Sequence, residues 1–367
     1  MPHLWPIPVP GRAGLVLAMA GLGLMFSSMA ALWLTGKGLP MNAYPPSRFV
    51  RSGPYSIVRH PIYFSFVAVV AGIAVAANSP AGFWIITPIS ALSVIGLVLG
   101  YEGPGLRARF GDALGHVPLL GPPPPGRTHA PLAMRLSAAA IVFGPWAILY
   151  VVLSMVPAPI DALDLRLDWE RNIALQGWAV WLYSAAYPVA IAGPLVLSTT
   201  GNLRRFVISG WFVTLLGFAT MLLLPGRAEL LPVRGSEIEV FLMQANRSLD
   251  ADWLALPSFH IAWVVLAAYC FAAARPGLRP LAMLSVGLVG LSCVLTGSHA
   301  VVDVVAGLAL GMFGWHHGQV WHALVAWSER LANSWNAVEL GPVRVISHAI
   351  WSGLGVWAAE GWKNADR

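Results

Sequence analysis

Residues 257–320 read PSFHIAWVVLAAYCFAAARPGLRPLAMLSVGLVGLSCVLTGSHAVVDVVAGLALGMFGWHHGQV, three apolar runs separated by two short polar turns. Each run predicts a membrane-spanning helix, because about 20 apolar residues are enough to cross a bilayer. We place these spans near 257–274, 279–297 and 299–320. The polar residues that stand at the start of the first and third spans are the candidates for chemistry.

The rest of the chain has the same apolar character. Of its 367 residues, 57% are hydrophobic and only 10% are charged, whereas a soluble domain carries about 25% charged residues. The sequence therefore predicts an all-α, polytopic transmembrane protein with about 9–10 spans. The remaining spans are expected near 12–35, 61–78, 81–101, 136–157, 177–198 and 204–225, with a weaker one near 341–359.

A stretch rich in proline and glycine, with four consecutive prolines at 122–125, divides the chain. Such a sequence cannot form a helix and is typical of a stiff linker. It separates two helical membrane units. We expect an amino-terminal unit at 1–117, a linker at 118–135, a carboxy-terminal unit at 136–325, and a surface helix with the weaker span at 326–367.

The charged residues are distributed unevenly between alternate loops. Arginines collect in loops 36–60 and 102–135, whereas acidic residues collect in loops 158–176 and 226–256. The positive-inside rule places the first two loops in the cytoplasm and the acidic loops outside. We expect a multi-pass protein of a bacterial inner membrane. The net charge of +6 comes from short loops rather than a basic stripe, so no nucleic-acid partner is indicated.

His260, His299 and Asp303 are the polar residues at the outer ends of two spans. His299 and Asp303 are four residues apart, which predicts that they share one helix face. A carboxylate in that position orients an imidazole and leaves its other ring nitrogen free to attack. His260 can then protonate a leaving group. The pattern predicts phosphoryl or acyl transfer.

The segments PSFHIAW and TGSHAVVDVVAG, which carry these residues, resemble two motifs of the type 2 phosphatidic acid phosphatase superfamily. The resemblance is closest to the branch that contains inositol phosphorylceramide synthases and sphingomyelin synthases. It implies that His299 is a nucleophile that forms phosphohistidine, that Asp303 supports it, and that His260 protonates the leaving group. It also implies membrane lipids as partners, a phospholipid or sphingolipid-type substrate, and no cofactor for this reaction.

This unit departs from the phosphatase branch of that superfamily. Ser292-Cys293 stands where that branch has Ser-Arg, and no lysine lies inside the unit. These differences favour a phosphotransferase over a general phosphatase. A transferring phosphoryl group still needs cationic donors. Arg227 is the first candidate for binding the substrate phosphate, and Arg234 and Arg247 are weaker ones.

Other histidines and the cysteines lie outside this pattern. His316, His317 and His322 have no acidic or thiol ligand at metal-binding spacing, so we interpret them as an interfacial belt and expect no metal. Cys270 and Cys293 lie inside apolar spans and are expected to be core residues.

The amino-terminal unit carries GKGLPMNAYPPSRFVRSGPYSIVRHPIY at 36–63 and YEGPGLRARFG at 101–111. These segments resemble the isoprenylcysteine carboxyl methyltransferase and phospholipid methyltransferase superfamily. The resemblance implies an S-adenosylmethionine site at the cytoplasmic face, although Gly103 replaces the second residue of the family's acidic pair. The residues implied in cofactor binding are Gly53, Tyr55, Arg59, His60, Tyr63 and Glu102.

Three functions remain open on the sequence. The first is a lipid phosphotransferase or lipid phosphate phosphatase on the outer face. The second is an S-adenosylmethionine-dependent methyltransferase of a lipid or prenylated substrate. The third is a non-enzymatic membrane scaffold or transporter built from two decayed enzyme units.

Overall fold

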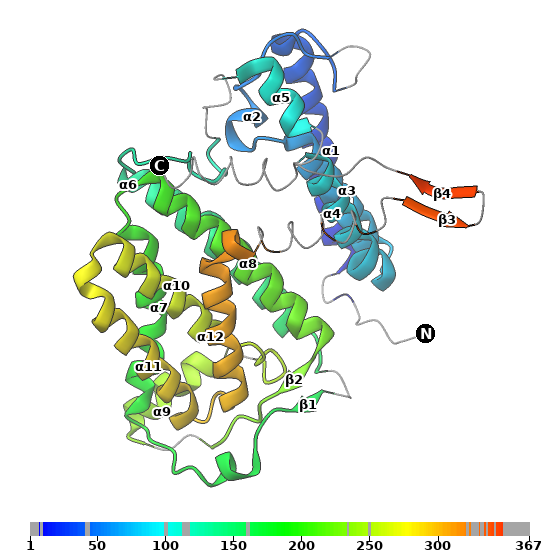
Figure 1. Cartoon of the computed structure of the whole chain (residues 1–367). Coiled ribbons are helices and arrows are strands. Elements are labelled where there is room, and N and C mark those ends of the chain that lie inside the picture. Colours follow the sequence, from blue (N-terminus) through cyan, green and yellow to red (C-terminus); the bar gives the residue numbers. More distant parts are fainter. Residues whose placement is uncertain are drawn as a thin grey trace. The chain divides into compact units, whose positions relative to one another are not determined.

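A computed structural model of the chain describes most residues between 7 and 347 (Figure 1). The chain divides into two compact units, Met1–Pro122 with Pro145–Pro159, and Pro123–Gly144 with Ile160–Arg367. The described residues are 7, 10–40, 45–98, 102–111, 118–158, 162–232, 235–248, 251–320, 323, 330, 334, 337–340 and 343–347.

The amino-terminal unit is built on two closely packed helices, α1 (Gly11–Ala31) and α3 (Pro61–Ala76). Glycines allow the close approach. A Cβ on Gly14 would lie 2.4 Å from the backbone nitrogen of Ala76, and a Cβ on Gly72 would lie 2.4 Å from the backbone nitrogen of Ala18. Small residues play this part when helices pack in lipid. The other helical segments of this unit are η1 (Leu32–Gly36), α2 (Pro54–Ile57), η2 (Gly82–Ile86), α4 (Thr87–Leu97) and α5 (Gly103–Phe110).

The carboxy-terminal unit is organised around α10 (Phe259–Ala274), which contacts α7, α8, α11 and α12 (Figure 1). Its sequence is apolar on every face, which is typical of a helix buried among others. Gly307 of α12 lies against the start of α10, because a Cβ there would meet the Ser258 carbonyl oxygen at 2.3 Å. The helices of this unit include α7 (Ala179–Leu195), α8 (Thr200–Leu223), α9 (Glu237–Arg247), α11 (Arg279–Leu295) and α12 (Val301–Trp315).

One long helix and several short segments remain to be placed. The helix α6 (Leu132–Ser154) crosses the division between the two units, which falls at Gly144 and Pro145. The strands β1 (Leu163–Asp164) and β2 (Gly226–Arg227) form a parallel pair. The remaining segments are the single turns η5 (Asp168–Asn172) and η6 (Pro276–Leu278).

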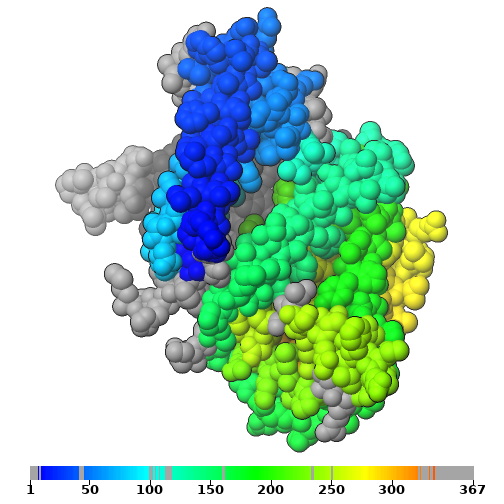
Figure 2. All heavy atoms as spheres, turned by 180° about the vertical axis from the view of Figure 1, so that it is seen from behind, coloured from blue at the N-terminus to red at the C-terminus, as the bar shows by residue number. Residues whose placement is uncertain are grey.

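The surface of the helices confirms the predicted membrane class. Large apolar side chains such as Val16, Met19 and Leu92 are exposed, which suits helices surrounded by lipid. Figure 2 shows α1 as a dark blue column along one face of its unit. Among the described residues, four apolar helices are long enough to cross a bilayer, at Gly11–Gly36, Leu132–Ser154, Thr200–Leu223 and Pro276–Leu295. Shorter apolar helices occupy the other predicted spans, at Pro61–Ala76, Gly82–Leu97, Ala179–Leu195, Phe259–Ala274 and Val301–Trp315.

The carboxy-terminal end differs from the prediction of a further span near 341–359. Its described part, Val343–Ser347, is the strand β4, which pairs antiparallel with β3 (Ala337–Leu340). The physical reason is local: Gly341-Pro342 favours a turn, and the valines and isoleucine that follow favour a strand. The rest of that predicted span lies outside the described residues. Of the expected surface helix, Arg330 and Ser334 are described, and both are helical.

Candidate active sites

The turn between α11 and α12 carries His299. It is built from Thr296 to Ala300, and Gly297 takes a positive φ of 67°, which glycine adopts without strain. The backbone N–H groups of Ser298 and His299 both donate to the Cys293 carbonyl, at 3.2 and 3.1 Å. His299 therefore precedes α12, whereas the sequence predicted that it lies on the helix with Asp303.

Asp303 nevertheless faces His299, as the four-residue spacing predicted. Its side chain is 0% exposed, and Oδ2 lies 3.4 Å from His299 Nδ1. The same oxygen accepts the backbone N–H of Ala300 at 2.9 Å. A buried carboxylate beside the first turn of a helix stabilises positive charge on the imidazole that it faces.

His260 completes the cluster from the first turn of α10. Its Nδ1 lies 3.3 Å from His299 Nε2, so the two imidazoles face each other. The hydroxyl of Ser258 lies 3.4 Å from the same His299 nitrogen. The Ser258 backbone N–H donates to the Asp303 carbonyl at 3.0 Å, which fixes the start of α10 against α12. The structure thus brings together all three residues that the sequence singled out as catalytic.

Two tyrosines that the sequence reasoning missed surround His260. Tyr187 OH lies 2.9 Å from His260 Nε2, and Tyr183 OH lies 3.4 Å from His260 Nδ1. The Tyr183 ring also packs on the imidazole, with centroids 4.4 Å apart. Both come from α7, where their four-residue spacing puts them on one face. That spacing was the available signal, but tyrosines on an apolar helix are ordinary core residues.

Two buried charged residues, also missed, hold the turn that carries His299. The Arg166 guanidinium, only 5% exposed, donates to the carbonyls of Glu229 (2.8 Å), Gly297 (2.7 Å) and His299 (3.5 Å). Burial lowers the pKa of Arg166, while the nearby carboxylates of Glu170 and Asp303 act in the opposite direction. Glu170, 1% exposed, accepts the Val301 N–H at 3.0 Å. Sequence reasoning counted Glu170 only as an acidic loop residue.

The predicted phosphate ligand, Arg227, lies in an ion pair with Asp252. Arg227, 57% exposed, donates through Nε to Asp252 Oδ2 at 2.6 Å. Arg247 instead donates to the carbonyls of Leu231 and Thr296, at 2.7 and 2.9 Å, so it contacts the backbone of the turn that carries His299. Arg234 lies outside the described residues.

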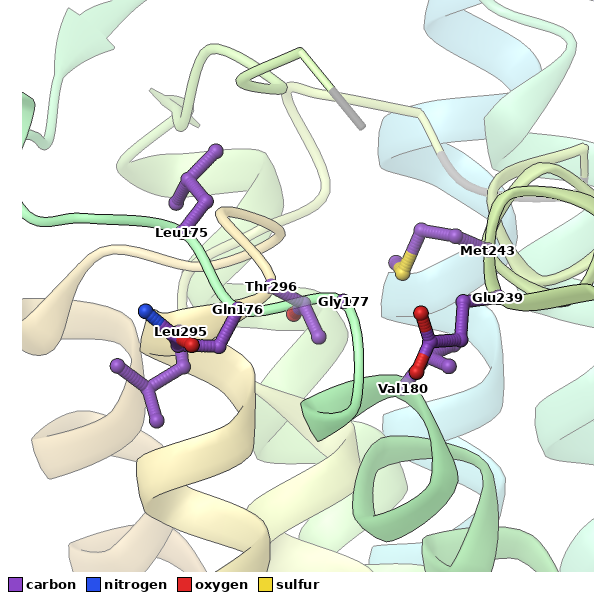
Figure 3. Close-up of a pocket in the computed structure, with 8 residues that line it drawn as sticks. All are labelled: Leu175, Gln176, Gly177, Val180, Glu239, Met243, Leu295 and Thr296. Carbon is purple, nitrogen blue, oxygen red and sulfur yellow. The ribbon is translucent and has the colours of Figure 1, made fainter. Parts of the chain in front are cut away.

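A small pocket adjoins the turn that carries His299 (Figure 3). The empty space in and around it amounts to about 220 Å³, which includes open solvent. Thr296 on its wall belongs to the turn that carries His299, while α7 and α9 supply other walls. The lining residues are Leu175, Gln176, Gly177, Val180, Glu239, Met243, Leu295 and Thr296.

At the opposite end of α12, the two described histidines pack against their neighbours. His317 Nδ1 lies 3.2 Å from Ser209 Oγ and 2.8 Å from the Gly314 carbonyl oxygen. The His316 ring meets Tyr269 edge to face at 5.5 Å. Among the described residues, no three His, Cys, Asp or Glu side chains gather as a metal site. His322 lies outside those residues.

The amino-terminal unit has a polar cluster of its own around Glu102, which directly precedes α5. His60 Nδ1 lies 3.3 Å from Glu102 Oε1, and Tyr63 also hydrogen-bonds to this carboxylate. Burial tends to raise the pKa of Glu102, but the hydrogen bonds from His60 and Tyr63 outweigh it and leave that pKa lowered. Burial, with the nearby Glu102 charge, raises the pKa of Tyr55.

Tight turns position this second cluster. Gly53, with a φ of 60°, precedes α2, and His60 directly precedes α3; a proline opens each helix. Arg59 lies between α2 and α3, next to His60. Of the residues predicted to bind the cofactor, the structure brings together Tyr55, His60, Tyr63 and Glu102. Gly53 shapes the turn.

Together, the helical fold and these two clusters define an integral membrane protein with a histidine–aspartate site in one unit and a glutamate-centred site in the other. Residues 164–316 match the family model described as PAP2 superfamily. Residues 10–113 match the model described as phospholipid methyltransferase. The two matches fall one in each unit, and they agree with the two-unit fusion that the sequence predicted. No curated protein and no solved structure matched the chain.

These matches support the prediction that the protein is an enzyme. The first supports a membrane phosphatase or phosphotransferase, and the second points to methyl transfer. The first match begins at residue 164, so it includes Arg166 and Glu170 as well as the histidines. Both families also favour lipids as substrates.

Proposed function

We propose that the carboxy-terminal unit is a lipid phosphotransferase or lipid phosphatase that works through a phosphohistidine intermediate at His299. The observation that carries this proposal is the opposed pair of imidazoles. His299 Nε2 and His260 Nδ1 are 3.3 Å apart, and Asp303 lies behind the first ring. A nucleophile and a proton donor therefore face each other, and a phosphorus atom would separate the two nitrogens when the substrate binds.

The first chemical step forms the intermediate. His299 Nε2 attacks phosphorus and forms an N–P bond, while the bond from phosphorus to the lipid oxygen breaks. The leaving oxygen takes the proton from Nδ1 of protonated His260. Asp303 stabilises the positive charge that develops on the His299 ring.

The second step reverses these roles. An acceptor hydroxyl, or water, attacks the phosphorus and gives its proton to His260 Nδ1, while the N–P bond breaks. His299 is thereby regenerated, and His260 is protonated for the next cycle. Water as acceptor makes the enzyme a phosphatase, and a lipid hydroxyl makes it a phosphotransferase.

The Ser292-Cys293 dipeptide and the absence of lysine from this unit favour the phosphotransferase, as in the inositol phosphorylceramide synthase-like branch. The proposed substrate is a phospholipid or sphingolipid-type molecule at the outer face of a bacterial inner membrane. Arg227 remains the proposed phosphate ligand. Since it now binds Asp252, the substrate phosphate would replace that carboxylate.

Isolation of the intermediate tests this proposal. Purified full-length protein would be mixed with phosphatidic acid or phosphatidylinositol labelled with ³²P and quenched in alkali, which preserves phosphohistidine. We expect one labelled peptide, with the phosphorus on His299. A label on His260 instead, or label released without passing through histidine, would contradict the assigned role of His299.

We propose S-adenosylmethionine-dependent methyl transfer as a second activity, in the amino-terminal unit. The cluster at Glu102 fits that cofactor, because a partly exposed carboxylate can bind its ammonium group or its ribose hydroxyls. Arg59 would hold the cofactor carboxylate, and Gly53 leaves open space beside the turn, with the nearest atom 4.0 Å from an added Cβ. The cofactor would supply the methyl group to a lipid or prenylated acceptor.

Replacement of Glu102 by glutamine is expected to weaken S-adenosylmethionine binding by at least about tenfold, because it removes the charge that pairs with the ammonium group. Isothermal titration calorimetry of the full chain in detergent would measure this. Ser93→Ala is the control, because the Ser93 hydroxyl of the same unit donates to the Ile89 carbonyl within α4. Equal affinity of the wild type and Glu102→Gln would exclude Glu102 from the site.

A further inference from the structure

We propose that Tyr187 is a positioning residue for His260: its hydroxyl oxygen accepts the Nε2–H of His260 and keeps that proton in place, so that the imidazole exchanges protons with substrate only through Nδ1. This inference rests on the proposed function for its catalytic meaning, but the protonation state that it describes exists without substrate. Neither family match assigns a role to this tyrosine.

The two ring nitrogens of His260 have different partners. His260 Nε2 lies 2.9 Å from Tyr187 OH, a full hydrogen bond, while Nδ1 lies 3.3 Å from His299 Nε2. The imidazole is thus held at one nitrogen by a helix that carries no other proposed catalytic residue. Its other nitrogen faces the reaction centre.

The chemistry of a shuttling histidine requires this arrangement. When His260 acts as an acid it carries both ring protons and loses the one on Nδ1. When it later acts as a base it must still carry the proton on Nε2, or Nδ1 would have no lone pair to offer. An acceptor at Nε2 stabilises both of these states. A tyrosine oxygen supplies that acceptor without adding a second negative charge to the site that binds phosphate.

Tyr183 differs from Tyr187 in what it contacts. Its ring packs on the His260 imidazole, and its hydroxyl lies 3.4 Å from Nδ1, the nitrogen on the substrate side. It therefore limits the tilt of the ring, whereas Tyr187 governs the protonation of Nε2. The pair arises from one sequence feature, two tyrosines four residues apart on α7.

Nuclear magnetic resonance tests the protonation state directly. The full chain would be labelled with ¹⁵N-histidine, which gives ten residues to resolve, and His260→Gln would assign the signals of interest. In the wild type we expect neutral His260 to carry its proton on Nε2. In Tyr187→Phe we expect the Nε2 signal to shift and a population protonated on Nδ1 to grow. A wild-type His260 protonated on Nδ1, or an unchanged spectrum in Tyr187→Phe, would overturn the inference.

Kinetic measurements with two leaving groups test whether Tyr187 affects proton donation by His260. An alkyl alcohol needs the proton from His260 to depart, but p-nitrophenol is acidic enough to leave without it. In Tyr187→Phe we expect kcat for dioleoyl phosphatidic acid to fall by about tenfold to a hundredfold, since a hydrogen bond to a charged group is lost. KM should be unchanged, and the loss with p-nitrophenyl phosphate should be much smaller.

The controls separate this inference from a structural effect and from the proposed function. Tyr269→Phe is the matched variant, because Tyr269 lies farther along α10 and stacks on Trp315; it should behave like the wild type. Equal losses on both substrates in Tyr187→Phe would show a merely structural role. If the wild type turned over neither substrate, its proposed phosphatase activity would fail, and the resonance measurement would still decide the role of Tyr187.

Discussion

Cells that express His299→Ala are expected to lack a lipid product that cells expressing the wild type contain. The variant removes the nucleophile, and enzymes that lose their nucleophile lose at least about a thousandfold in kcat. Mass spectrometry of extracted lipids would measure the effect. The species that disappears would identify the product, and the species that accumulates would identify the donor.

A matched histidine controls for expression and folding in this experiment. His129→Ala changes an exposed histidine whose backbone pairs with Thr199, away from the cluster, and should leave the lipid profile as in the wild type. Identical profiles for the wild type and His299→Ala would contradict the proposed phosphoryl transfer. The Glu102 cluster would then become the stronger candidate, and failure of cofactor binding there as well would favour a non-enzymatic role.

Much of the fold followed from apolar patterning, because a bilayer requires long apolar helices and the turns between them are marked by charge, glycine and proline. The prediction was wrong at Val343–Ser347, where local turn and strand preferences outweighed a hydropathy signal that was weak from the start. Whether a segment of modest hydropathy is a helix depends on what covers it, and the sequence does not contain that information.

The histidines and Asp303 could be predicted because charged or polar residues are rare at membrane depth and their spacing has a direct chemical meaning. Tyr187 and Arg166 could not be predicted in the same way. Each acts on the cluster through a contact between segments more than 70 residues apart in sequence, 73 for Tyr187 with His260 and 131 for Arg166 with Gly297. A tyrosine in an apolar helix and an arginine in a loop are both common, so only the fold reveals their partners.

Replacement of Arg166 by methionine is expected to destabilise the carboxy-terminal unit by about 3–5 kcal/mol, because each buried group left without its hydrogen-bond partner costs about 1–3 kcal/mol. The carbonyls of Gly297 and Glu229 would lose a buried donor, and the buried carboxylate of Glu170 would lose its neighbouring positive charge. Thermal unfolding in detergent, followed by tryptophan fluorescence, would measure the change. Activity should fall as well, since the turn that carries His299 would no longer be held.

A second arginine in the same loop, Arg171, provides the control for this measurement. Arg171 makes ion pairs with Asp164 and Glu229 at the surface, so Arg171→Met should cost no more than about 1 kcal/mol. The double variant Arg166→Met/Glu170→Gln should lose less than the sum of its single variants, because a neutral residue 170 no longer depends on the nearby positive charge of Arg166. If Arg166→Met were as mild as Arg171→Met, the two hydrogen bonds to the Cys293 carbonyl would suffice to hold His299 in place. A large loss confined to Arg166 would instead mean that the loop before α7, and not the two helices alone, determines where His299 lies.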